Sequence, residues 1–461
     1  MQKLQPLLLA ALACCWISGS QANRVYIHPF HLFAVDNVSC ETLQGSAVKP
    51  LETVAVETLD VEVLTPDSRD RSSLDAQTQN MTVRTAVLAG LLNPLGLRMY
   101  HALSRKQNNT VFSPVNTYGS LAAFYLGASK KTARSFQEFL LLSSGTDRED
   151  CVSLVDGHKI LSTLQVINSL VDDGSGDEIT TRVWAFARSD AQLSRDFIQG
   201  TRDFSDKSFI RGVDFSKHEE VQTLVNSFVE KTSDGKLTNV FKGLNPSSNF
   251  LFLSSFSFKG NWMAAFRPDK ISMEEFHVDE ATKVTTSTMT RTYNYHYLND
   301  TVNRCTVVKL PLSKQSHMLL ILPHEGTTLG HVENKLLTSF MGGWHKNLQE
   351  GLLELSLPKF SLSSVIDIHD LLSTMNRRLG PTLLGSQAEF SRLSNTSPFS
   401  VDEAMNNVMF EMSGEAAEPQ AGPTEAGVAL RLSINRPFFF SVIEEHYESI
   451  LLLGKITNPT L

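Results

Sequence analysis

Nine residues, Phe250 to Phe258, constrain the fold of this 461-residue chain more than any other segment. They read Phe-Leu-Phe-Leu-Ser-Ser-Phe-Ser-Phe and include no charged side chain. A strand this apolar is stable only where both of its faces are covered, because an exposed face would leave large aromatic side chains in water. The segment is therefore predicted to be a central strand of a large sheet.

A helix is predicted near the start of the folded region. Val83, Val87 and Leu91 recur at the spacing of one helix face. Asn93-Pro94 is expected to interrupt that helix, because proline removes a backbone donor, before Leu97–His101 continue it.

Further elements follow from local patterns. They are a buried helix over Tyr118–Leu126 that ends at Gly127, a strand over Val183–Ala187, and an amphipathic helix over Val221–Lys231 followed by Asp234-Gly235. Helices early in the chain and strands late favour an α+β architecture over alternating βαβ units.

Seven short motifs then occur in a fixed order. They are Val111-Phe112-Ser113-Pro114, Val213-Asp214-Phe215, Asp234-Gly235-Lys236 with Phe241, Phe258-Lys259-Gly260-Asn261-Trp262, Leu357-Pro358-Lys359-Phe360, Asn435-Arg436-Pro437-Phe438-Phe439 and Gly454-Lys455-Ile456-Thr457-Asn458-Pro459. In this order they resemble the serpins, over about residues 81–461. The resemblance implies a large central mixed sheet, surrounding helices and an exposed reactive-centre-like loop ahead of the C-terminal strands.

The segment 410–423 bears on which serpin activity to expect. Inhibitory serpins insert this loop, once cleaved, into the main sheet, which requires a hinge of small residues. Here Pro419 and Pro423 remove two backbone donors from a strand that would lie inside the sheet. Ser254 and Asn406 also replace the asparagine and histidine usual where the family's sheet opens. The sequence predicts a loop that does not insert, although drift within one lineage would produce the same departures.

The first 22 residues have the parts of a secretory signal peptide. Lys3 supplies a positive start, Leu7–Ile17 an apolar core, and Ser20-Gln21-Ala22 a small-x-small cleavage site. The apolar core is too short to span a bilayer. We expect a secreted, extracellular (plasma) protein without membrane insertion, whose mature chain starts at Asn23.

The ten residues after that site combine one cation, a phenol, two imidazoles, a proline and a phenylalanine. In order they are Asn23, Arg24, Val25, Tyr26, Ile27, His28, Pro29, Phe30, His31 and Leu32. Pro29 favours an extended backbone around it. An exposed, extended segment of this kind suits a protease cleft or a receptor pocket, whereas the alternative is a terminal tail without a role.

This decapeptide resembles the angiotensin peptides. The resemblance implies that the aspartic protease renin cuts between Leu32 and Phe33, a pair of large apolar residues of the kind that such proteases accept. It also implies that angiotensin-converting enzyme cuts between Phe30 and His31. The octapeptide 23–30 would then bind angiotensin receptors.

An acidic arm, residues 33–80, separates the peptide from the serpin-like region. Residues 41–80 include eight acidic and three basic side chains, a local net charge of −5, and no aromatic residue. This composition predicts a mobile or loosely packed segment. The chain thus divides into a signal peptide (1–22), the peptide (23–32), the arm (33–80) and a serpin domain (81–461).

Three cysteines remain after the signal peptide. Cys305 lies in an apolar, β-branched run that predicts a strand, so we expect a buried free thiol. Cys40 and Cys151 lie in polar, irregular segments and are predicted to form a disulfide, which the resemblance also implies. The bridge would close a loop of roughly 110 residues, worth about 4–5 kcal/mol in the chain-entropy model.

Charge and motifs exclude several classes of function. The formal net charge of −8 disfavours nucleic acid and anionic membranes as partners. No phosphate-binding glycine loop, hydrolase Ser motif or Cys/His cluster with metal-ligand spacing occurs, so neither a cofactor nor a metal is expected. His28 and His31 have no third ligand nearby. N-glycosylation is predicted at the five sequons, Asn37, Asn80, Asn108, Asn299 and Asn395.

Together these patterns predict a secreted prohormone and not an enzyme: a serpin-like body that carries a peptide and releases it on cleavage. Two alternatives remain open. A secreted inhibitor of a serine protease would need a functional hinge, and a hormone-transport serpin would need an apolar ligand pocket.

Overall fold

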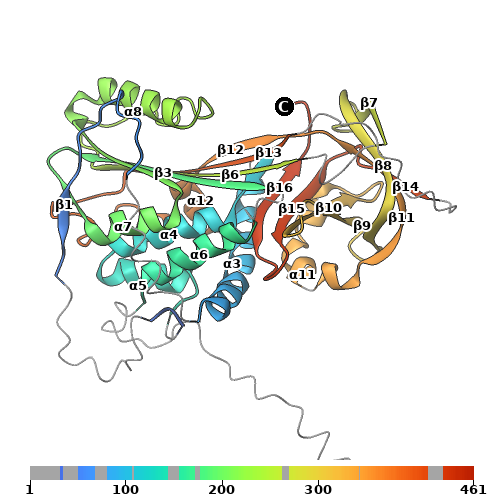
Figure 1. The fold of residues 1–461 in the computed structure, drawn as a ribbon, viewed down its shortest axis with the longest axis horizontal. Helices are drawn as coiled ribbons and strands as arrows, with labels where there is room; N and C mark the ends of the chain where they lie inside the picture. Colours follow the sequence, from blue (N-terminus) through green and yellow to red (C-terminus); the bar gives the residue numbers. More distant parts are fainter. Residues whose placement is uncertain are drawn as a thin grey trace, which may run out of the picture.

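A computed structural model of the chain contains two large sheets with helices packed around them (Figure 1). It describes residues 32–34, 50–67, 80–105, 108–143, 155–171, 177–261, 269–341, 343–413 and 429–461.

Helices predominate in the first half of the described chain and strands in the second. The α-helices are α3 (Met81–Ser104), α4 (Pro114–Gly127), α5 (Lys130–Phe139), α6 (Gly157–Val171), α7 (Arg195–Phe204), α8 (His218–Thr232), α10 (Leu329–Glu333), α11 (Leu336–Met341), α12 (Ile368–Met375) and α13 (Leu379–Leu383), and the 3-10 helices are η4 (Phe215–Lys217) and η5 (Trp344–Asn347). The strands are β1 (Thr53–Ala55), β2 (Thr110–Phe112), β3 (Glu178–Arg188), β4 (Gln192–Ser194), β5 (Lys207–Val213), β6 (Phe250–Asn261), β7 (Lys270–His277), β8 (Lys283–Asp300), β9 (Cys305–Pro311), β10 (Ser316–Pro323), β11 (Gln349–Pro358), β12 (Leu362–Asp367), β13 (Glu403–Ser413), β14 (Leu430–Ser433), β15 (Phe438–Glu444) and β16 (Ile450–Ile456).

The strand predicted to be central lies in the middle of a five-stranded mixed sheet. The strand order is β12-β13-β6-β3-β5, and β6 pairs antiparallel with β3 and parallel with β13. In Figure 1, α8 covers one face of this sheet, while α4, α6 and α7 lie under the other. The prediction from Phe250–Phe258 is confirmed, because both faces of the strand are covered.

Alternate residues of β6 serve two different clusters of buried side chains. Phe250 and Phe252 join the main hydrophobic core, whereas Leu251 and Leu253 join a smaller cluster with Phe228 of α8. All of these side chains are fully buried. This alternation is the period of two expected of a strand, applied to two apolar faces instead of one.

The second large sheet contains nine strands. Its main path runs β14-β11-β8-β9-β10-β15-β16-β2, and β7 pairs with β8. The C-terminal strands β15 and β16 are buried along their whole length. The prediction of an α+β fold with a large mixed sheet is confirmed, with two large sheets where the sequence indicated one.

Helix α3 is continuous through Pro94, so the predicted interruption at Asn93-Pro94 is wrong. The Asn93 side chain donates to the Glu448 carbonyl oxygen (2.8 Å) and accepts from the Ile450 amide (2.9 Å). Half of the helix is buried along the core. This packing outweighs the roughly 3 kcal/mol that an interior proline costs.

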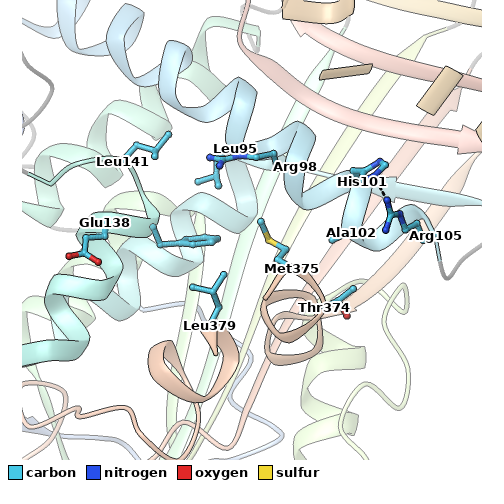
Figure 2. A pocket seen from close by; sticks show the side chains of 11 residues that line it. Leu95, Arg98, His101, Ala102, Arg105, Glu138, Leu141, Thr374, Met375 and Leu379 are labelled. Atoms are coloured by element: carbon cyan, nitrogen blue, oxygen red, sulfur yellow. Dashed lines mark hydrogen bonds between the residues drawn. The ribbon is translucent and has the colours of Figure 1, made fainter. Parts of the chain in front are cut away.

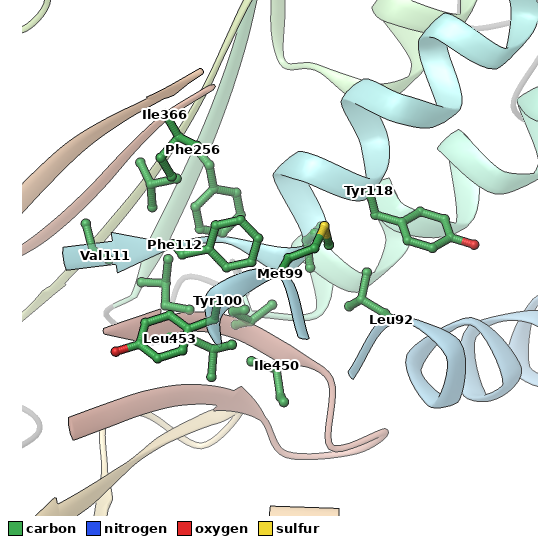
Figure 3. Close-up of a cluster of buried hydrophobic side chains, with 14 of the residues drawn as sticks. Leu92, Met99, Tyr100, Val111, Phe112, Tyr118, Phe256, Ile366, Ile450 and Leu453 are labelled. Atoms are coloured by element: carbon green, nitrogen blue, oxygen red, sulfur yellow. The ribbon is translucent and has the colours of Figure 1, made fainter. Parts of the chain in front are cut away.

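The main core joins the helices to the C-terminal strands. Figure 3 shows side chains of α3, α4, β2 and β16 converging there, among them Met99, Phe112 and Leu453, which are fully buried. Tyr100 of α3 also donates its hydroxyl to Glu333 at 2.9 Å. Helices from the first half of the chain and strands from its C-terminal end therefore contribute to the same main core.

Several smaller predictions can be compared with the structure. The buried helix ending at Gly127, the strand over Val183–Ala187 and the helix over Val221–Lys231 are all present. Cys305 opens β9 as a buried free thiol, as predicted, and burial raises its pKa to about 12. Among the described helices, none is long and apolar enough to cross a membrane.

Candidate functional site

The predicted cleavage site, Leu32–Phe33, lies on the folded body. Phe33 is 0% exposed and belongs to the main core, while Leu32 is partly buried and packs against it. Both residues have helical backbone. The expected extended, exposed conformation is therefore wrong at this bond, because burying a large apolar side chain is worth about 1.5–3 kcal/mol. Residues 23–31 lie outside the described part of the chain.

Three contacts attach the backbone of Phe33 and Ala34, the residues after this bond, to residues 155–159 at the start of α6. The Asp156 amide donates to the Phe33 carbonyl oxygen at 2.7 Å. Ala34 forms an antiparallel bridge with Val155, and the Lys159 ammonium donates to the Ala34 carbonyl oxygen at 2.5 Å. We call residues 32–34 with these partners the peptide anchor. It fixes the C-terminal side of the predicted scissile bond.

The body side of the peptide anchor is itself held by buried polar contacts. The Tyr125 hydroxyl of α4 donates to the Val155 carbonyl oxygen at 3.0 Å and accepts from Gln137 of α5 at 2.9 Å. Burial raises the pKa of Tyr125 well above its usual value, so the phenol stays protonated and can donate. The anchor thus rests on α4 and α5 as well as on α6.

An ionised histidine strengthens the start of α6. The His158 amide donates to Asp156 at 2.9 Å, and its ring lies 3.4 Å from Asp203 and 3.9 Å from Asp196 of α7. Burial alone would lower the pKa of His158, but the hydrogen bonds to Asp196 and Asp203 outweigh it and raise the pKa to about 9. His158 is therefore charged at neutral pH and ties α6 to α7.

The next described segment, residues 50–67, follows the body closely, and we call it the docked arm. β1 pairs with β4, and Thr58 bridges Gly212 on the edge of β5. The Leu59 amide donates to the Gly212 carbonyl oxygen, and the Gly212 amide donates to Glu57. The arm thereby covers a sheet edge whose backbone groups would otherwise lack partners.

A buried ion pair closes the docked arm. Arg211 of β5 donates to the Asp67 carboxylate at 2.6 Å and to the Thr65 carbonyl oxygen at 2.9 Å. The Arg211 and Asp67 side chains are only 4% and 12% exposed. The prediction of a loosely packed arm is wrong for residues 50–67, because its acidic side chains alternate with apolar ones that pack onto the body.

The strands β6 and β13 pair directly, and we call their junction the sheet seam. Their register runs over eleven residues, from Glu403 opposite Leu251 to Ser413 opposite Asn261. By resemblance to inhibitory serpins, this is the position at which a cleaved loop would insert into the sheet. In the described part of the chain no strand lies between them, and residues 414–428 fall outside it.

Helix α4 supplies hydrogen-bond partners for Ser254 and Asn406, the two residues at the sheet seam that are unusual for the family. Ser254 donates to the Asn116 side-chain oxygen at 2.6 Å. Asn406 accepts from Ser120 at 3.0 Å and donates to Thr117 at 2.9 Å. Both residues are fully buried, so these contacts are the polar core of the closed seam.

The remaining predicted sites are distributed over the surface or lie outside the described residues. Asn80, Asn108 and Asn299 are exposed. Asn395 is exposed too, and its side chain accepts from the Gln192 amide at 3.1 Å. Asn37, Cys40 and Cys151 lie outside the described part of the chain, as do Phe30 and His31. No group of acidic, His and Cys side chains among the described residues has the arrangement of a metal site.

Sequence reasoning missed the partners of both attachments. Asp156 could have been suspected as a helix start, because it precedes the periodic run of α6. Nothing local to Lys159 or Arg211 indicates their long-range contacts with Ala34 and Asp67.

Comparison with known proteins places this architecture in a family. A family model described as "Serpin (serine protease inhibitor)" matches residues 91–459, and the chain therefore belongs to the serpin family. Within that family it is similar to angiotensinogens over nearly its whole length. It is 29% identical to that of Bos taurus, over 98% of this chain and 97% of that protein, and 27% identical to that of Homo sapiens, over 98% of both.

Other serpins match a smaller share of the chain. Serpin A3-2 of Bos taurus is 27% identical over 78% of this chain and 85% of its own length. Among solved structures, mouse protein-Z dependent protease inhibitor superposes with a TM-score of 0.71 at 21% identity, covering 83% of this chain and 100% of its own. A thyroxine-binding globulin complex with thyroxine superposes with a TM-score of 0.67 at 23% identity, covering 80% and 99%. These structures show the fold alone.

Proposed function

We propose that this chain is a secreted prohormone whose serpin body carries the decapeptide 23–32 and controls its release. Renin cuts between Leu32 and Phe33, and angiotensin-converting enzyme then removes His31-Leu32. The octapeptide 23–30 acts on angiotensin receptors to raise blood pressure and regulate salt and fluid balance. The body is a non-inhibitory carrier and not an enzyme, and it needs no cofactor.

The peptide anchor is the observation that carries this proposal. Protease inhibition alone does not require Phe33 to be buried, nor hydrogen bonds to the carbonyl oxygens of Phe33 and Ala34. The likeness to angiotensinogens supports it, because those matches cover 98% of the chain whereas the serpin A3 matches cover 78%.

The geometry implies an order of events at the scissile bond. A protease cleft takes a substrate in extended form, whereas Leu32 and Phe33 have helical backbone and partly or fully buried side chains. Phe33 must therefore leave the core and release the Asp156 amide before the cut. Such local opening costs less than global unfolding, so it can limit the rate of cleavage while the body stays folded.

The sheet seam supports a non-inhibitory body. Inserting a loop between β6 and β13 would separate eleven paired residues and the contacts of Ser254 and Asn406 with α4. In addition, the Ser255 hydroxyl of β6 donates to the Asn407 side-chain oxygen of β13 at 2.9 Å, directly across the seam. Pro419 and Pro423 would offer no donors in return.

Mass analysis of the intact chain after treatment with renin tests the proposal. We expect one cut, with products that end at Leu32 and begin at Phe33. Leu32→Asp should abolish it, whereas Leu64→Asp, at a half-exposed leucine of the docked arm, should leave it unchanged. A cut elsewhere, or none, would contradict the proposal.

The alternative, an inhibitor of a serine protease, has a separate test. Incubation with a panel of serine proteases should yield loop cleavage without a covalent complex stable to denaturant. Such a complex would show that the body inhibits the protease and would contradict its interpretation as a non-inhibitory carrier.

We further propose that the Cys40–Cys151 disulfide restricts the arm and that the sequons carry glycans. Cys40→Ser should then change the rate of renin cleavage, and an unchanged rate would refute a role for the bridge. Exposure of Asn80, Asn108 and Asn299 supports glycosylation there, which a mass shift on deglycosylation would reveal.

A further inference from the structure

A cavity of about 450 Å³ opens between helices α3, α5, α12 and α13, and none of the residues that line it belongs to the peptide anchor. Figure 2 shows its lining, with Arg98, His101 and Arg105 on the α3 side and Met375 and Leu379 facing them. Its volume is within the range of about 300–1,000 Å³ that small-molecule sites occupy.

The body of the cavity is apolar. Leu95 is almost fully buried, and Ala102, Phe139, Met375 and Leu379 are partly buried side chains that pack against the main core. They come from four helices, so the cavity is not a groove along a single element. An apolar molecule that entered it would remove these side chains from water.

One rim of the cavity is cationic. Arg98, His101 and Arg105 follow one another at three- and four-residue spacing, which places them along the same side of α3. The lining contains one carboxylate, Glu138, and that group already pairs with Arg134 at 3.0 Å. Neither Arg98 nor Arg105 has a carboxylate partner in the described part of the chain.

Two of these basic side chains are hydrogen-bonded to each other. The Arg105 guanidinium lies 2.6 Å from the His101 ring, as the dashed line in Figure 2 marks. Burial and the charge of Arg105 lower the pKa of His101, and Glu333 opposes them only in part. The charges that remain at this rim are those of Arg98 and Arg105, which no carboxylate among the described residues pairs with, and an anion there would offset them.

We propose that this cavity binds a small amphiphilic organic anion. Its carboxylate or sulfonate meets Arg98 and Arg105, and its apolar part lies against Leu95, Phe139 and Met375. Cations also favour the C-terminal end of a helix. That effect accounts for Arg105, just after α3, but not for Arg98, more than one turn earlier, or for the apolar cavity. This site goes beyond peptide release and does not depend on it.

Calorimetry with a matched pair of ligands, decanoate and decanol, tests the proposal on the full chain. Decanoate should bind at one saturable site, and decanol, which lacks the charge, at least about tenfold more weakly. 8-Anilinonaphthalene-1-sulfonate, an aromatic sulfonate, should be displaced by decanoate, which would show that the two anion types share the site.

Variants separate the rim from the cavity. Arg98→Glu with Arg105→Glu should weaken decanoate at least about tenfold and leave decanol unchanged. Ala102→Trp should block both ligands, and Thr374→Trp at the exposed rim is a second blocking variant in case the first does not fold. Lys242→Glu, which reverses one charge at an exposed position, is the control and should bind normally.

Three results would overturn the proposal. They are the absence of saturable decanoate binding, equal affinity for decanoate and decanol, and unchanged binding in a folded Thr374→Trp chain. A loss of binding in Lys242→Glu equal to that in the double variant would show general charge attraction and would also overturn it.

Discussion

The two attachments of the N-terminal region differ in size and in kind. The peptide anchor holds the chain through one buried aromatic side chain and three contacts to residues 155–159. The docked arm, residues 50–67, adds backbone pairing along two strand edges and the buried Asp67–Arg211 ion pair.

This difference indicates which attachment opens. The peptide anchor involves few residues, so it can open locally while the body remains folded. The docked arm cannot leave without removing the carboxylate partner of the Arg211 guanidinium, which is buried in the folded chain. The proposed scissile bond thus lies at the weaker attachment, and the stronger one would keep the rest of the arm on the body after cleavage.

The largest expected effect concerns the docked arm. Asp67→Ala should lower the free energy of unfolding by about 3–5 kcal/mol, because it leaves a buried guanidinium without its carboxylate. Urea denaturation would measure the loss, and hydrogen exchange at the Ile210 and Gly212 amides would locate it. A loss below about 1 kcal/mol would mean that the two attachments do not differ in strength.

The second prediction concerns pH and the peptide anchor. The pKa of His158 is raised in the folded state to about 9, from about 6.5 when unfolded, so its contribution is full below pH 6.5 and is lost as the pH rises through 9. The contribution is on the order of 3 kcal/mol.

Measuring unfolding of the wild type and His158→Gln between pH 6 and 9.5 checks this. The two stabilities should converge toward pH 9.5, because the variant lacks the charge. Parallel curves would show that Asp196 and Asp203 do not hold a charged ring.

The third prediction concerns the rate of cleavage. Lys159→Ala removes the ammonium bound to the Ala34 carbonyl oxygen and leaves residues 23–36, on both sides of the proposed cleavage site, unchanged. A loss of about 1 kcal/mol from the peptide anchor should speed cleavage at Leu32–Phe33 about fivefold. Lys131→Ala, at an exposed lysine of α5, is the matched control. Equal acceleration in both variants would show that the Lys159 contact does not hold the peptide anchor closed.

The smallest effect is expected at the exposed ion pair of the docked arm. Lys231 of α8 contacts Glu62 at 3.0 Å, with side chains 39% and 79% exposed. Lys231→Ala should therefore cost no more than about 0.5–1 kcal/mol in urea denaturation. A cost as large as that of Asp67→Ala would show that an exposed ion pair stabilises the docked arm as much as the buried one does. The buried ion pair would then no longer explain why the docked arm is held more strongly than the peptide anchor.

The elements that sequence predicted correctly are those with strong local patterns. β6 is apolar on both faces, and α4 and α8 have clear periodicity and ends. Prediction went wrong where tertiary contacts outweigh local preference. Pro94 lies inside an unbroken helix because α3 is packed along the core.

The candidate site divides in the same way. The pair Leu32–Phe33 is recognisable from its residue types, but its burial depends on Asp156 and Lys159, more than 120 residues later in the chain. The acidic composition of residues 41–80 likewise conceals the contacts of Asp67 with Arg211. Composition describes average solvation, and it does not contain the position of a partner on a distant strand.

The most direct test compares renin cleavage of the intact chain with cleavage of a free peptide that spans residues 23–36. Cleavage rates are measured at low substrate concentration, with products identified by mass. We predict the same bond, Leu32–Phe33, in both substrates and a slower rate in the intact chain, because Phe33 must first leave the core. Equal rates, or a different bond in the intact chain, would contradict control of this bond by the body.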